Sequence, residues 1–297
     1  MTHAHEKPPA GTERTRASAA IARGTSRLAE AGVPSPRVDA EILAAHVLGV
    51  PRSQLLLSDG FTDETLLPFV KAIEKRATGV PVQHITGRAP FRHIELSVGP
   101  GVFIPRPETE LVTDWGLAAL AGHSRPVVVD LCSGSGAIAL AVANERRDAT
   151  VYAVERSPEA LTWLRRNAAE RADAGDTHIT VVEGDITDDA VLAELNGTVD
   201  LVLCNPPYVP AGTKVAVEVD HDPPQAVFGG EEGLDLVPAV IAMAGRLLTG
   251  GGSFAVEHDE THGAEVPALL REDGRFAVIR LRYDLAQRAR YTTAHKG

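Results

Sequence analysis

Apolar residues are spaced in two different ways along the chain. From about Ser18 to Thr78 they recur with helical periodicity, so that Ile42, Leu43 and Val47 share one face of a helix. After Arg125, short apolar runs alternate with amphipathic stretches. This alternation predicts strands at residues 126–131, 150–155, 178–182, 199–204, 252–257, 275–281 and 290–294, and helices at 136–146, 158–172, 234–248 and 262–272.

The alternation predicts an α/β domain with a doubly wound, mostly parallel seven-stranded sheet. Residues 127–129 and 201–203 are apolar throughout, which is typical of strands covered on both faces. Before this domain, Phe91 and Leu96 suit short strands, and Gly87 and Gly99 suit turns. We expect a flexible tail at 1–18, a small all-helical domain at 19–80, a β-hairpin linker at 81–105 and the α/β domain at 106–297, which starts with a helix to about residue 120.

The first predicted strand of the α/β domain runs into a glycine-rich turn. Gly134 and Gly136 allow a sharp turn and close approach of a ligand, and the helix that follows offers unpaired amide groups. Glu155 lies about 20 residues further on, at the end of the second strand, where a carboxylate can accept hydrogen bonds from two ribose hydroxyls. Ile138 stands where a dinucleotide site has its third glycine. The turn therefore favours a nucleoside ligand over a dinucleotide, the alternative being a plain strand-to-helix turn.

A third contact point follows the third strand. Asp185 comes directly after Gly184, where its carboxylate can accept from the amino group of an adenine. Taken by itself, such an aspartate is more typical of a turn.

The loop after the fourth strand carries the most informative residues, Asn205, Pro206, Pro207 and Tyr208. Two prolines stiffen the loop, and its polar groups are acceptors: the Asn205 side-chain oxygen and the Pro206 carbonyl. Two converging acceptors bind both hydrogens of an NH2 group, and Tyr208 offers a flat face to a planar substrate or a sulfonium. The loop predicts a clamp for a planar amide or amine nitrogen, with Asn205, Pro206 and Tyr208 as catalytic residues; a rigid loop without a substrate is the alternative.

Composition narrows the class of protein. The net charge is −11, whereas proteins that bind duplex phosphate usually carry a basic face, so we expect no direct nucleic-acid target. Cys132 and Cys204 are the only cysteines, which excludes a disulfide scaffold and favours a reducing compartment. No apolar run approaches the roughly 20 residues of a membrane helix. We expect a cytoplasmic monomer with no metal site and no membrane association.

These motifs together resemble the release factor glutamine methyltransferases, the HemK family. The resemblance extends to Ser35–Leu43, Pro81–Gly87, Phe103–Glu110, Asp130–Ala139, Asn205–Tyr208 and Gly229–Asp235. It implies a class I, Rossmann-like methyltransferase that uses S-adenosyl-L-methionine and methylates the glutamine of the Gly-Gly-Gln motif in peptide-chain release factors. The helical domain would help to dock that substrate.

The resemblance also implies site residues. Asn205, Pro206, Pro207 and Tyr208 would hold the glutamine. The cofactor would contact Asp130, Cys132, Ser133, Gly134, Ser135, Gly136, Glu155, Asp185, Ile186 and Asn205.

Some positions depart from the family pattern. The family often has Asp at Glu155, Glu-Ile-Gly at residues 257–259, and Gly at Gln287. These departures leave the core chemistry intact and concern the outer rim of the substrate site.

Three other functions remain open. A ribosomal-protein glutamine methyltransferase would share the Asn-Pro-Pro-Tyr loop, although residues 106–110 favour the release factor branch. An adenine-directed nucleic-acid methyltransferase would need a basic face and a base-flipping pocket. A cofactor-binding protein without catalysis would have no need of the intact loop.

Overall fold

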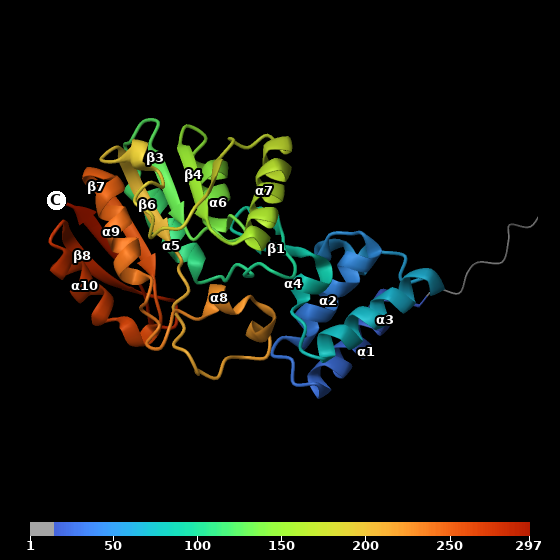
Figure 1. Ribbon diagram of the computed structural model, residues 1–297. Helices are drawn as coiled ribbons and strands as arrows, with labels where there is room; N and C mark the ends of the chain where they lie inside the picture. Colours follow the sequence, from blue (N-terminus) through green and yellow to red (C-terminus); the bar gives the residue numbers. More distant parts are fainter. Residues whose placement is uncertain (1–14) are drawn as a thin grey trace, which may run out of the picture. The chain divides into compact units, whose positions relative to one another are not determined.

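The computed structural model describes residues 15–297, and the tail expected at residues 1–18 lies mostly outside them. The chain divides into two compact units, one that ends at Thr86 and one from Gly87 to Gly297. The division falls inside the segment predicted as a linker. Figure 1 labels helices and strands of both units.

The N-terminal unit is helical, as its periodicity predicts. It consists of α1 (Ala17–Glu30), α2 (Pro36–Leu48), the 3-10 helix η1 (Arg52–Leu57), α3 (Asp63–Ala77) and α4 (Val82–Thr86). Its core contains Phe61 and Phe69, whose ring centroids are 4.8 Å apart. A buried ion pair joins two helices, because Arg76 of α3 donates to Asp39 of α2 over 2.6 Å.

The second unit is built on the predicted seven-stranded sheet, which is confirmed. Its strands are β3 (Val127–Leu131), β4 (Thr150–Glu155), β5 (Thr180–Glu183), β6 (Val199–Cys204), β7 (Leu248–Glu257), β8 (Phe276–Tyr283) and β9 (Ala289–Lys296). Their order is β5-β4-β3-β6-β7-β9-β8, and only β9 runs antiparallel to its neighbours. The strands β4 and β5 follow β3 on one side of it, whereas β6 and β7 lie on its other side. The order therefore reverses between β3 and β6, and such a switch point opens a crevice at the carboxyl ends of the strands.

Side chains alternate between the two faces of the sheet and form two cores. Val128 and Leu201 pack with α5 (Thr109–Ala119), α6 (Ala137–Glu145) and α7 (Pro158–Asp173). Val129 and Val202 pack on the other face with α9 (Val237–Leu247) and α10 (Glu265–Asp273) (Figure 1). The remaining short helices are η2 (Ala193–Leu195), η3 (Val219–His221), α8 (Pro224–Val227) and η4 (Glu260–His262).

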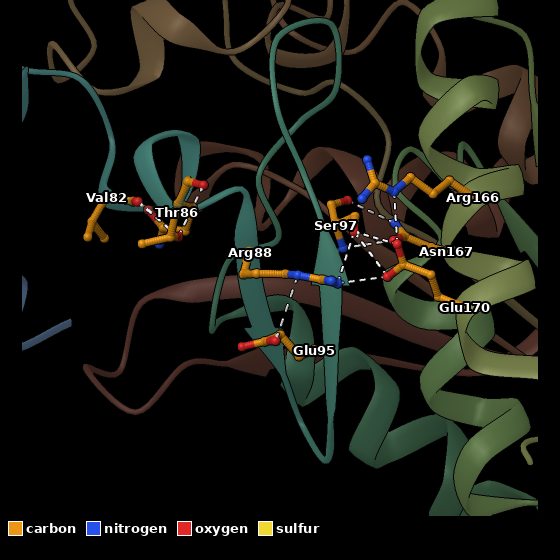
Figure 2. Close-up of polar contacts among 9 residues, drawn as sticks. Val82, Thr86, Arg88, Glu95, Ser97, Arg166, Asn167 and Glu170 are labelled. Carbon is orange, nitrogen blue, oxygen red and sulfur yellow. Dashed lines mark hydrogen bonds and ion pairs between the residues drawn. The ribbon is translucent and has the colours of Figure 1, made fainter. Parts of the chain in front are cut away.

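The predicted hairpin is present as β1 (Arg88–Phe91) and β2 (Ile94–Ser97), paired antiparallel. Figure 2 shows how it is fixed to α7: Ser97 and Arg88 both hydrogen-bond Glu170. Burial opposes ionisation of Glu170, but hydrogen bonds from Arg166, Arg88 and Ser97 outweigh it and lower the pKa of Glu170 to about 2. The hairpin is therefore held by a charged network that persists in mildly acidic solution.

Within residues 15–297, no helix has the length and apolar character needed to cross a membrane. The same residues contain no group of three or more His, Cys, Asp or Glu side chains placed to hold a metal ion.

Candidate active site

A cavity of about 1020 Å³, counted out to its opening to solvent, lies at the carboxyl ends of β3, β4 and β6. Its walls come from the glycine-rich turn after β3, the ends of β4 and β6, and two segments that precede α5 and form α8. The lining residues with assigned roles are Asp130, Cys132, Ser133, Gly134, Ser135, Glu155, Ile186, Asn205 and Pro207.

The glycine-rich turn combines two glycines with different tasks. At Gly134 (φ +55°) a Cβ atom would meet nothing within 4 Å, so this position faces open space. At Gly136 (φ +87°) a Cβ atom would lie 2.5 Å from Leu164 Cδ1 of α7. Gly136 does not line the cavity; it allows α6 to start against α7. Cys132 also has a positive φ, 58°, which is strained for a residue with a side chain.

Asp130 lies beneath this turn with its side chain buried. Its Oδ2 atom accepts from the backbone N–H of Ala139 in α6 (3.2 Å), and its Oδ1 atom has no hydrogen-bond partner among the described residues. Burial, with a smaller effect of the Glu155 charge, raises the pKa of Asp130 to about 7, although the nearby Ser133 hydroxyl and the hydrogen bond from the Ala139 N–H act against it.

Glu155 is the anchor of the opposite wall. Its Oε2 accepts from the Gly134 N–H (2.8 Å), and its Oε1 accepts from the N–H groups of Arg156 (2.9 Å) and Ser157 (2.8 Å). Three backbone donors thus fix the carboxylate in one orientation at the cavity wall. Carboxylate oxygens carry further lone pairs, so this arrangement keeps acceptors available for a pair of hydroxyls.

Asp185 is arranged differently from Glu155. Its carboxylate accepts from the Thr187 N–H (2.9 Å) and hydroxyl (2.7 Å), and pairs with Arg156 (3.1 Å). The Thr187 N–H is the main cause that lowers the pKa of Asp185. Asp185 itself does not line the cavity, whereas its neighbours Gly184 and Ile186 do. Its expected contact with an adenine stays a prediction.

The Asn-Pro-Pro-Tyr loop meets the cavity through Asn205 and Pro207. The Asn205 amide nitrogen donates to the Thr109 hydroxyl at the start of α5 (3.0 Å), which leaves the amide oxygen as the group that can accept from a ligand. Pro206 and Tyr208 do not line the cavity. Tyr208 instead donates its hydroxyl to Glu257 Oε1 at the end of β7 (2.9 Å).

Two glycines after α8 pack closely against the backbone of this loop. A Cβ atom at Gly229 would lie 2.5 Å from the carbonyl oxygen of Pro207, and one at Gly233 would lie 2.3 Å from that of Tyr208. Val209 also bonds to this segment, donating its N–H to the carbonyl oxygen of Val227 (3.0 Å). Only glycine permits this close backbone approach, which explains the glycines in residues 229–233.

An ion pair joins two segments that line the cavity. Asp222 accepts from the Ile104 N–H (3.0 Å) and from the Arg106 guanidinium, which also lies 4.9 Å from the centroid of the Phe103 ring. Burial raises the pKa of Asp222, and the Arg106 charge acts against that rise. The pair ties residues 101–105 to residues 223–226, and both segments line the cavity.

Sequence reasoning missed several of these residues. Thr109, Asp222 and Glu257 carry no local signal of their function, because each acts on a residue distant in the sequence. The matched stretch from Phe103 to Glu110 contains Thr109 and Arg106, yet their partners become visible only in the folded chain.

Each of the two units matches a family model of known proteins. Residues 19–87 match the family model described as PrmC N-terminal domain, and residues 95–223 match the one described as Methyltransferase small domain. These two models fit the helical unit and the sheet-containing unit.

Full-length relatives agree. The chain is 46% identical to the release factor glutamine methyltransferase of Mycolicibacterium smegmatis, over 94% of this chain and 98% of that protein. It is 44% identical to the one of Corynebacterium glutamicum (93% and 98%) and 45% identical to the one of Streptomyces coelicolor (94% and 97%). The seven-stranded sheet, the cavity at its switch point and these relatives show that the chain belongs to the release factor glutamine methyltransferase family, whose members have the class I methyltransferase fold.

Proposed function

We propose that this methyltransferase transfers a methyl group from S-adenosyl-L-methionine to the side-chain amide nitrogen of the glutamine in the Gly-Gly-Gln motif of peptide-chain release factors. The observation that carries the proposal is the orientation of Asn205. Because Thr109 accepts from the amide nitrogen, the amide oxygen is left to accept from a substrate NH2 group. The names of the relatives supply the identity of that substrate.

The residues around the cavity fit the cofactor. Glu155 has a fixed carboxylate suited to two ribose hydroxyls, and Gly134 leaves space where a side chain would intrude. Ile138 and Ile186 offer apolar surface for a flat base. When bound, S-adenosyl-L-methionine supplies an electrophilic methyl group on a sulfonium centre.

The side chains of the loop then have to position the nucleophile. An amide nitrogen is a weak nucleophile because its lone pair is delocalised into the carbonyl. Asn205 lines the cavity, and its oxygen can accept one hydrogen of the amide. We propose that the Pro206 carbonyl accepts the other hydrogen, although Pro206 does not itself line the cavity, so that the two bonds fix the nitrogen and direct its lone pair. Holding reacting groups in line contributes a large part of enzymatic rate enhancement, so positioning is the principal task of this site.

No general base has to act before attack. The methylated nitrogen is strongly acidic until it loses its proton, and water at the open side of the cavity can accept it. Glu257, which accepts from Tyr208, and Asp130, which accepts from the Ala139 N–H, are both buried and serve as hydrogen-bond acceptors.

The test is methyl transfer from radiolabelled cofactor to a purified release factor. Four acceptors are compared: the intact release factor, its variant with alanine at the Gly-Gly-Gln glutamine, ribosomal proteins and duplex DNA. The proposal requires label on the intact release factor and none on the alanine variant. Label on DNA or ribosomal protein, with an unmodified release factor, would replace it with one of the other two methyltransferase functions.

A further inference from the structure

His262 is a buried histidine in contact with residues 229–233, the segment whose glycines pack against the Asn-Pro-Pro-Tyr loop. It is the last residue of η4 and is 5% exposed. Its Nε2 atom lies 2.8 Å from the carbonyl oxygen of Glu232. A Cβ atom at Gly233 would lie 2.9 Å from the ring atom Cε1, so the edge of the ring also packs directly on this glycine. The described residues that line the cavity include neither His262 nor Glu232, so the ring acts on this segment and not on a ligand.

The contact with Glu232 determines which ring nitrogen of His262 carries the hydrogen. A carbonyl oxygen can only accept, so Nε2 is the donor and, in the neutral ring, Nδ1 is an acceptor. This Nδ1 atom is buried and has no hydrogen-bond partner among the described residues. An apolar side chain would avoid the unpaired nitrogen, so packing alone does not account for a histidine at this position. What the histidine adds is the donor to the Glu232 backbone.

The turn that carries His262 is itself held in place. Asp259 begins η4: its carboxylate accepts from the Thr261 N–H (3.0 Å) and hydroxyl (2.7 Å), and its carbonyl oxygen accepts from the His262 N–H (3.0 Å). The His258 ring bonds the same carbonyl through Nδ1 (2.9 Å) and the Thr292 hydroxyl of β9 through Nε2 (2.9 Å). His258 and Asp259 stand where the family often has Ile and Gly, so these two departures help to fix the turn that presents His262.

The segment held by His262 packs against the backbone of the clamp. Gly233 lies against the carbonyl oxygen of Tyr208, and Gly229 lies against that of Pro207. While the segment stays in place, these contacts leave the loop no room to shift toward it. Methyl transfer requires the amide nitrogen in line with the methyl group, so a small displacement of the loop should lower the rate much more than the affinity for the cofactor.

We propose that His262 is a positioning residue for methyl transfer: by donating to the Glu232 carbonyl it holds residues 229–233 against the Asn-Pro-Pro-Tyr loop and so fixes the acceptors of the clamp. This inference rests on the proposed methylation of an amide. It assigns a function in the reaction to a histidine that lies outside the cavity lining.

The experiment compares His262→Gln and His262→Asn with the wild type in single-turnover methyl transfer to a release factor. The amide nitrogen of glutamine can reach the place of Nε2 and donate to Glu232, whereas that of asparagine lies near the place of Nδ1, where the ring has no partner. His262→Asn should lose about tenfold or more in rate, and His262→Gln should stay within about threefold of the wild type. Calorimetry should give a cofactor Kd within about threefold of the wild type for both variants.

His295→Gln is the matched control. His295 is a partly buried histidine of β9 whose Nδ1 lies 3.2 Å from the Ser253 hydroxyl in the middle of β7. Its replacement should leave both the rate and the cofactor Kd within about threefold of the wild type. A loss of rate in His295→Gln as large as that in His262→Asn would show that the effect is not specific to the contact with Glu232, and would overturn the inference.

Three results with the His262 variants would overturn the inference while leaving the proposed function intact: wild-type rates in His262→Asn, equal losses in His262→Asn and His262→Gln, or a cofactor Kd that rises in step with the loss of rate. A wild-type enzyme that fails to methylate the release factor would instead refute the proposed function. Thermal unfolding shows whether each variant is folded at the temperature of the assay. If His262→Asn is not, His262→Gln decides the question, because a loss of about tenfold in this folded variant contradicts the inference and a rate near that of the wild type supports it.

Discussion

The side-chain amide of Asn167 in α7 donates to the carbonyl oxygen of Ser135 in the glycine-rich turn over 2.9 Å. The same amide group pairs with the backbone of Ser97 in β2, accepting from its N–H (2.7 Å) and donating to its carbonyl (3.0 Å) (Figure 2). One buried side chain therefore joins the hairpin to the turn that lines the cavity.

Replacing this residue should affect stability and cofactor binding together. Asn167→Ala leaves buried backbone groups of Ser97 and Ser135 without partners, which should cost about 2 kcal/mol or more of unfolding free energy. The cofactor Kd should rise in parallel because the turn loses a support. Asn167→Asp retains the acceptor for the Ser97 N–H but turns a buried carboxylate oxygen toward the carbonyl oxygens of Ser97 and Ser135, so it should destabilise the fold at least as much. Denaturant unfolding and calorimetry measure both quantities, and an unchanged cofactor Kd in Asn167→Ala would separate the hairpin from the cofactor site.

Glu155 should contribute to affinity for the cofactor with little effect on chemistry. Glu155→Gln replaces one acceptor oxygen with a donor in a site already occupied by three N–H donors, so the Kd for S-adenosyl-L-methionine should rise about 10- to 100-fold, or about 1.4 to 2.7 kcal/mol. Glu155→Asp keeps the charge and should bind within several-fold of the wild type. Calorimetric titration decides this, and equal affinities for the Glu155→Gln and wild-type proteins would remove Glu155 from the cofactor site.

Asn205, in contrast to Glu155, should contribute to methyl transfer with little effect on the affinity for the cofactor. Asn205→Ala removes the acceptor for the substrate nitrogen and should abolish methyl transfer, yet leave the cofactor Kd within roughly tenfold, about 1.4 kcal/mol. Single-turnover assays and calorimetry on the same preparation test this division. A much larger loss of cofactor affinity would mean that Asn205 acts mainly on the cofactor.

Asp130 predicts a pH dependence of stability. Its pKa in the folded protein is raised to about 7, mainly by burial, above the ordinary value of 3.8. The folded state therefore binds this proton more tightly than the unfolded state, so the group stabilises the fold at low pH and that contribution is lost as pH rises to about 7. Asp130→Asn should flatten the pH dependence of the unfolding free energy between about pH 4 and 7. Parallel slopes for variant and wild type would contradict this assignment.

The helical unit supplies a test of substrate docking. Leu56 and Leu57 on η1 are adjacent and each 85% exposed, which is unusual for apolar side chains. If they contact the release factor, the Leu56→Ser, Leu57→Ser double variant should raise KM for the intact factor severalfold and leave turnover of a short Gly-Gly-Gln peptide unchanged. Leu285→Ser is the matched control, because Leu285 is 92% exposed on the other unit. Equal KM values for the double variant and for Leu285→Ser would show that Leu56 and Leu57 do not dock the release factor.

The sequence pattern predicted the parts of the fold and site that depend on local order. The apolar runs at 127–129 and 201–203 became the central strands β3 and β6, and Glu155 took its place beside the glycine-rich turn. The relation between Asn205 and Thr109 could not be predicted, because the two residues are 96 positions apart and meet only when α5 packs beside β6. The position of Tyr208 also depends on a distant strand, since Glu257 holds its hydroxyl.

The central claim is that the loop at Asn205 presents a glutamine amide for methylation. The most direct measurement is fragmentation mass spectrometry of the Gly-Gly-Gln peptide from a release factor incubated with enzyme and isotopically labelled S-adenosyl-L-methionine. We expect a single labelled methyl group on the side-chain nitrogen of that glutamine, present with the wild type and absent with Asn205→Ala. An unmodified glutamine, or a methyl group on another residue, would contradict the claim.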